Sequence, residues 1–138
     1  MHLINERYAI LEAMEPQSIA AAGAATGKFF DTQTRKTFSF SALLGAVTAG
    51  KSAKVELLAS DAAEGTDAAP VGEVTYTAPA GGVDGHVVTV SGHVTALRGR
   101  YLALRVTNNG TAALLASAVL LADSVTNPED TGGTTLVV

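Results

Sequence analysis

The chain contains 138 residues, the size of one domain with a single hydrophobic core. Hydrophobic residues make up 47% of it and charged residues only 16%, against about 25% in an average soluble domain, so we expect partners to cover much of the surface. The net charge is −4 with no lysine or arginine cluster, which argues against nucleic-acid binding, and the absence of cysteine excludes disulfides, zinc–thiolate sites and thiol catalysis.

The first predicted element is a short amphipathic helix over residues 3–14, ended by Pro16. Four apolar residues follow each other at spacings of four, three and three, which puts them on one helical face: Ile4, Tyr8, Leu11 and Met14. Residues 18–26 are small and include glycine, which is typical of a connector. We therefore predict an N-terminal arm, helical or extended, over residues 1–26.

From residue 28 onward the pattern changes to period two, which is typical of half-buried strands. Polar and apolar residues alternate in five segments, 36–41, 54–57, 73–77, 88–91 and 100–107. Asn109–Gly110 predicts a hairpin turn, because both residues tolerate positive φ. The apolar run 112–122 suits a buried helix or a buried strand, and its place after that turn favours the returning strand of the hairpin.

Together these segments predict an all-β fold, an antiparallel β-sandwich of jelly-roll type with about seven or eight strands over residues 27–123. Residues 124–138 are then a C-terminal arm or tail. A parallel α/β sheet is disfavoured because no long helix separates the strands. The longest apolar run has eleven residues, too short to span a membrane, and charges near the N-terminus argue against a signal peptide, so we expect synthesis in the cytoplasm.

One motif points to nucleotide binding. Residues 45–52, GAVTAGKS, match the phosphate-binding pattern G-x-x-x-x-G-K-[ST], in which Lys51 would contact the phosphates and Ser52 would hold Mg²⁺. That motif requires a buried parallel strand before it and a helix after it, whereas both flanking segments alternate. We therefore interpret Ala49–Gly50–Lys51 as a hairpin turn and keep nucleotide binding as a less favoured alternative.

The other candidate sites are weaker. His86 and His93 are seven residues apart, and on one strand this odd separation puts them on opposite faces, which does not suit a shared metal. Asp61, Glu64 and Asp67 form an acidic loop without calcium-loop spacing, which we interpret as a solvated turn. No serine lies in a G-x-S-x-G elbow, so we expect neither an enzyme nor a bound cofactor or metal.

Three segments resemble small structural proteins of tailed bacteriophages: residues 55–65 (VELLASDAAEG), 100–112 (RYLALRVTNNGTA) and 118–123 (AVLLAD). The group they resemble most is the capsid decoration, or cement, proteins, which bind the outside of the head shell. The resemblance implies a jelly-roll-like sandwich, self-association into dimers or trimers, attachment to the major capsid protein and a place on the head surface of the virion. It implies no catalytic residues.

We therefore predict a non-enzymatic virion protein that binds and stabilises the head shell. The alternatives are another virion module, at a head-completion, tail or fibre position, and the nucleotide-binding protein considered above. The apolar face of the N-terminal segment would cap its own sandwich or lie in a neighbour's groove, and the C-terminal residues would add a strand to an adjacent chain. The candidate interface residues are Ile4, Tyr8, Leu11, Met14, Leu136, Val137 and Val138.

Overall fold

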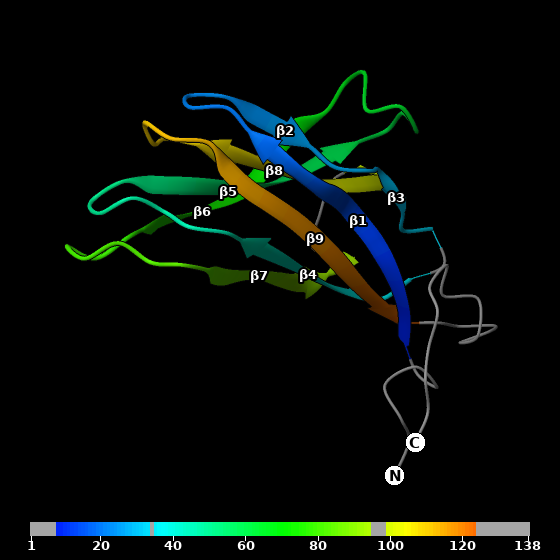
Figure 1. Ribbon diagram of the computed structural model, residues 1–138. Helices are drawn as coiled ribbons and strands as arrows, with labels where there is room; N and C mark the ends of the chain where they lie inside the picture. The colour runs from blue at the N-terminus through cyan, green and yellow to red at the C-terminus, as the bar shows by residue number, and fades with distance from the viewer. Residues whose placement is uncertain (1–7, 34, 95–98, 124–138) are drawn as a thin grey trace, which may run out of the picture.

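A computed structural model describes residues 8–33, 35–94 and 99–123, and its regular elements are strands in two antiparallel sheets (Figure 1). The strands are β1 (Tyr8–Ile19), β2 (Ala24–Thr26), β3 (Phe30–Asp31), β4 (Thr37–Leu44), β5 (Ser52–Ser60), β6 (Ala69–Thr77), β7 (His86–His93), β8 (Tyr101–Asn108) and β9 (Leu114–Asp123). One sheet has the order β1-β9-β4-β7 and the other β2-β8-β5-β6, with β3 also paired to β8. The predicted β-sandwich is confirmed. None of the described residues forms a helix that could cross a lipid bilayer.

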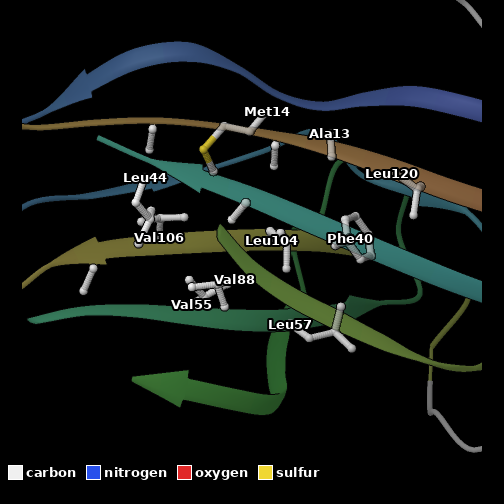
Figure 2. Packing of buried hydrophobic residues seen from close by; sticks show 14 of the residues in the cluster. Ala13, Met14, Phe40, Leu44, Val55, Leu57, Val88, Leu104, Val106 and Leu120 are labelled. Carbon is white, nitrogen blue, oxygen red and sulfur yellow. The ribbon is translucent and has the colours of Figure 1, made fainter. Parts of the chain in front are cut away.

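The strands alternate in burial because one face of each sheet packs against the other sheet. In β4 every second residue from Phe38 to Leu44 is buried, and β9 repeats the pattern from Leu114 to Ala122. Phe40 is fully buried in the core (Figure 2). The core side chains come from both sheets, and those labelled in the figure also include Ala13, Met14, Leu44, Val55, Leu57, Val88, Leu104, Val106 and Leu120.

Most connections cross from one sheet to the other, as in jelly rolls. Among the described strands only β5 and β6 are consecutive and directly paired. The run 112–122 is a strand, as interpreted, but the hairpin predicted at Asn109–Gly110 is wrong, because β8 and β9 belong to different sheets and neither residue has positive φ. The Asn108 amide organises the crossing instead: its Nδ2 donates to the carbonyl oxygens of Ile19 and Ala112 at 3.0 and 2.8 Å.

The predicted N-terminal helix is wrong over the described residues, because β1 is an edge strand paired with β9 from Tyr8–Asp123 to Ile19–Leu114. Two register shifts interrupt β1, between Glu12 and Met14 and between Met14 and Gln17. At each shift an extra residue in β1 changes which positions face the core. The apolar residues of β1 therefore no longer alternate strictly, and their spacing resembles that of a helix. Both β1 and β2 belong to the sheets, although the sequence pattern predicts an arm there.

The two sides of the sandwich are closed to different degrees. On one side the segment after β2 links the sheets: the Gly27 N–H donates to the Leu104 carbonyl of β8, and the Lys28 N–H donates to the Ala13 carbonyl of β1, both at 2.8 Å. A Cβ on Gly27 would lie 2.2 Å from the Ala13 oxygen, so only glycine permits this approach. On the other side β6 and β7 are the edge strands of their sheets among the described residues.

Candidate interaction face

The outward side chains of β4, of β7 and of β9 as far as Leu121 form one surface without Asp, Glu, Lys or Arg. We call this surface the neutral face, and its members are Thr37, Ser39, Ser41, Leu43, Val87, Thr89, Ser91, His93, Leu115, Ser117, Val119 and Leu121. Leu115 is 65% exposed, Val87 55% and Leu43 46%, the most exposed large apolar side chains among the described residues. Among the described residues, two carboxylates border it, those of Glu12 on β1 and of Asp123 at the end of β9.

Strand register brings the hydroxyl groups of this face together. Ser39 lies opposite Leu121 on one side and Ser91 on the other, and the two serine hydroxyls are hydrogen-bonded at 2.8 Å. Ser41 lies between Val119 and Thr89 in the same way. A surface of short hydroxyl and branched apolar side chains loses little rotamer entropy on contact, and it has no charge to desolvate. Such a surface suits a broad, flat protein contact.

Two hollows lie along the boundary between the neutral face and β1. One, of about 420 Å³, has Leu43, Gly45 and Leu115 among its lining residues. The other, of about 320 Å³, lies between Ile10 on β1 and Val119 on β9. Pro16 borders both, so the irregular part of β1 shapes them. These hollows would accept apolar side chains from a bound partner, as the centre of a protein interface does.

The outer surface of the second sheet has the opposite character. Glu56 on β5 lies opposite Arg105 on β8, and the guanidinium donates two parallel hydrogen bonds to its carboxylate, at 3.1 and 3.0 Å. The Lys54 ammonium lies 3.5 Å from the same carboxylate. The side chain of Glu56 is only 4% exposed, so this charge is buried and compensated.

The environment of this ion pair shifts both pKa values. The Arg105 guanidinium, by donating to the carboxylate, holds the pKa of Glu56 below its ordinary value of 4.5, and Lys54 acts in the same direction. The carboxylate correspondingly raises the pKa of Arg105. Partial burial opposes both shifts without overcoming them. The pair therefore stays ionised at neutral pH and holds β5 and β8 in register.

Three of the predicted interface residues, Tyr8, Leu11 and Met14, lie among the described residues, all on β1. Met14 is 1% exposed inside the sandwich, Leu11 lines a pocket near Phe40, and Tyr8 is half-buried at the start of β1. Met14 is therefore a core residue, because the extended backbone of β1 directs it between the sheets. The remaining candidates lie outside the described residues: Ile4, Leu136, Val137 and Val138.

The phosphate-binding pattern falls in the crossing connection between β4 and β5. The Lys51 N–H donates to the Thr48 carbonyl at 2.9 Å and Gly50 has a φ of 69°, which defines a tight turn. The turn is not the predicted hairpin turn, because β4 and β5 lie in different sheets. The flanking strands are antiparallel members of a sandwich and strand β5 takes the place of the helix, so the context that this motif requires is absent here.

The histidines and the acidic loop have structural surroundings. His86 and His93 are at opposite ends of β7, and His86 stacks on Tyr76 with ring centroids 3.7 Å apart. The Asp67 carboxylate accepts hydrogen bonds from the Ser60 hydroxyl and from the Asp61 N–H, and these bonds lower its pKa, so it holds the β5–β6 turn. Among the described residues no three His, Asp or Glu side chains are placed to hold a metal ion.

Sequence reasoning missed the neutral face, although the sequence contains a signal for it. Three stretches, 37–50, 85–97 and 106–122, lack Asp, Glu, Lys and Arg, and each contains one strand of the same sheet. The stretches become one surface only because β9, β4 and β7 are neighbours. That adjacency depends on contacts between distant parts of the chain, which a local pattern does not encode.

Comparison with known proteins identifies the fold. No protein-family model matches this sequence, and no curated protein is significantly similar to it. Among solved structures, the chain is similar over its whole length to the PBSX exported protein XepA, with a TM-score of 0.57 and 13% identity, and it spans 44% of that protein's chain. It is also similar to the PRD1 vertex protein P5, with a TM-score of 0.51 and 12% identity over 86% of this chain and 96% of that one. The chain shares the β-sandwich fold of phage-related proteins.

Proposed function

We propose that this chain is a non-enzymatic structural protein of a tailed-phage virion that binds the head shell through its neutral face. The observation that carries the proposal is the neutral face itself, where exposed Leu43, Val87 and Leu115 stand among hydroxyl groups. A contiguous exposed apolar patch on a rigid sheet marks a protein-binding surface. The sandwich fold shared with phage-related proteins supports a virion context, as does the resemblance of the sequence to decoration proteins.

The proposed partner is the major capsid protein, and the proposed location is the outer surface of the head. Since one face of a 138-residue chain offers a contact of limited size, we propose that the chain acts as a dimer or trimer. An oligomer that contacts two or more capsid subunits converts weak single contacts into high avidity. No cofactor takes part.

The direct test is co-sedimentation of the purified chain with expanded heads of the phage whose genome encodes it. We expect binding at micromolar concentration, and we expect Leu115→Glu to weaken it by about tenfold or more, since a buried unpaired carboxylate costs more than 1.4 kcal/mol. Val71→Glu is the matched control, because Val71 is 41% exposed on β6, away from the neutral face. No binding by the unmodified chain, or equal losses in both variants, would contradict the proposal.

A second candidate is another virion module, at a head-completion, tail or fibre position. The similarity to a vertex protein, which this chain matches over most of that protein's length, favours it. Immunogold labelling of intact virions separates the two candidates: label spread over the head supports decoration, and label confined to a vertex or to the tail supports the alternative.

A further inference from the structure

The edge strand β7 differs from the other edge strands of the two sheets (Figure 1). In soluble proteins an edge strand is commonly protected from pairing with another chain by proline, charge, irregular register or short length. β1 contains Pro16, two glutamates and two register shifts, and β6 contains Pro70, Glu73 and one register shift against β5. β2 and β3 have only three and two residues. Among the described strands, β7 alone is a long edge in regular register that lacks proline and charge.

The ladder between β4 and β7 determines which backbone groups of β7 point away from its sheet. The Val94 N–H donates to the Lys36 carbonyl at 2.9 Å, and this pair continues the β4–β7 register. In an antiparallel ladder every second pair of opposite residues is hydrogen-bonded, so alternate residues of β7 direct their N–H and C=O groups away from β4. These residues are Val87, Thr89, Ser91 and His93. Among the described residues, no strand pairs with them on that side.

These four residues are complementary to the same four residues of a second copy. A second β7 that runs antiparallel to the first places Val87 opposite His93 and Thr89 opposite Ser91, with a two-fold axis at Val90. In this register all four residues of each strand lie in hydrogen-bonded pairs. A shift by two residues in either direction leaves one of the four without a partner within β7. The sequence of β7 therefore favours one self-pairing register.

The side chains of the two copies are also compatible in this register. Opposite residues of an antiparallel pair lie on the same face of the sheet, and branched apolar pairs and hydroxyl pairs stabilise the contact. On the inner face Val90 meets its counterpart at the two-fold axis, and Val88 lies opposite Gly92, which has no side chain to oppose it. On the outer face the Thr89 hydroxyl lies opposite the Ser91 hydroxyl. No two like charges meet within the paired strands.

The groove between β6 and β7 does not oppose this pairing. It is lined in part by Glu73, whose carboxylate lies 3.9 Å from the Lys54 ammonium, and by Phe38, whose ring lies against Gly92. A second β7 extends the sheet beside the first one, and its inner side chains belong to the sandwich of the second copy. The pairing therefore needs no space in the groove and displaces neither the carboxylate nor the ring.

We propose that two copies of this chain pair through β7, antiparallel and about a two-fold axis at Val90. The two four-stranded sheets then become one sheet of eight strands. Since opposite residues share a face, the two neutral faces lie on the same side of this sheet and form one surface of twice the width. A two-fold contact of this kind closes at two copies. The inference specifies the oligomer named under the proposed function as a dimer, but it rests on β7 and not on head binding.

Sedimentation equilibrium of the full chain, without phage heads, is the first test. We expect a reversible dimer, and we expect Thr89→Pro to raise its Kd by about tenfold or more, because proline removes a donor that points to the second copy and spares the ladder with β4. Thr75→Pro on β6 is the matched control. The Ala78 N–H donates to the Lys51 carbonyl, so by the same alternation the Thr75 N–H points away from β5.

Single-cysteine variants test the register, because the chain contains no cysteine of its own. Val90→Cys places two thiols opposite each other in a pair without backbone hydrogen bonds, where the Cα atoms are about 4.5 Å apart and a disulfide can form. Val87→Cys is the control: Val87 is 55% exposed, but its two copies lie about 20 Å apart in this register. On oxidation we expect Val90→Cys to form cross-linked dimer about tenfold faster or more, measured by non-reducing electrophoresis.

Several outcomes would overturn the proposal. A chain that remains monomeric up to about 1 mM, or one that forms trimers, has no two-fold pairing of this kind. Equal weakening by Thr89→Pro and Thr75→Pro, or none by Thr89→Pro, would assign the contact to another surface. Cross-linking of Val87→Cys as fast as that of Val90→Cys would exclude the register. Circular dichroism verifies that both proline variants keep the sandwich, and the cysteine comparison depends on neither. A failure of head binding is detected separately, by co-sedimentation, and leaves these results unchanged.

Discussion

The two outer surfaces of the sandwich differ in whether their side chains find partners within the chain. On the β2-β8-β5-β6 sheet, Glu56 is buried and paired with Arg105 and Lys54, so its charge is compensated by side chains of the same chain. On the neutral face, Leu115 and Val87 remain more than half exposed and have no charged neighbour on β4, β7 or β9. The difference indicates that the outer surface of the β2-β8-β5-β6 sheet contributes to stability, whereas the neutral face is available to a partner.

The largest expected effect comes from breaking the ion pair. Arg105→Met should destabilise the fold by about 2 kcal/mol, less than for a fully buried pair because Arg105 is one-third exposed and Lys54 remains near the carboxylate. Adding Glu56→Leu should recover most of the loss, because no buried charge is then left unpaired. Urea unfolding of the unmodified chain, the single variant and the double variant measures these differences in stability. A double variant as unstable as the single variant would contradict the prediction.

A smaller effect is expected in acid. Because the pKa of Glu56 lies below 4.5 in the folded state, its contribution to the free energy of unfolding is complete above about pH 4.5 and is lost as the pH falls through the lower, folded-state pKa. Unfolding measured between neutral pH and pH 2 should show this decline. Glu56→Leu, Arg105→Met should decline less over the same range, and identical pH profiles would exclude the pair as a contributor.

The smallest effect on stability is expected on the neutral face. Leu115→Ser and Leu43→Ser should each change the free energy of unfolding by no more than about 0.5 kcal/mol, since neither side chain is buried in the folded chain. Both should weaken co-sedimentation with expanded heads, because both side chains belong to the neutral face. A loss of stability as large as that of Arg105→Met would mean that these residues support the fold, and the contrast between the two surfaces would fail.

The fold class was predictable because alternation is a local property. The segments around Phe38 and Leu104 are strands in the structure, and the ambiguous run 112–122 is one as well. The helix predicted through Met14 failed because two register shifts in β1 disturb the alternation, and the hairpins at Gly50 and Gly110 failed because the same turn residues also serve crossings between sheets. Register shifts and the choice between a hairpin and a crossing both depend on how distant strands pair, which local sequence does not determine.

The candidate site was less predictable than the fold. Exposed apolar residues such as Leu43 and Leu115 lie 72 positions apart in the sequence, yet both line one hollow. The predicted interface residue Met14 instead packs inside the sandwich, where β9 supplies an apolar partner. Composition did indicate an unusually uncharged chain, but the location of that uncharged surface depended on which strands are neighbours.

The pairing of β1 with β9 also has a consequence for the order of folding. Ile10 lies beside Leu121, so the first described strand finds its sheet partner more than a hundred residues later. Crossing connections add further long-range pairings, and folds dominated by such contacts fold slowly, over milliseconds to seconds. During synthesis β1 therefore has no strand of its own sheet to pair with until β9 has been made. The β1 side of the sandwich closes late, after the strands that pair without β9 are already available.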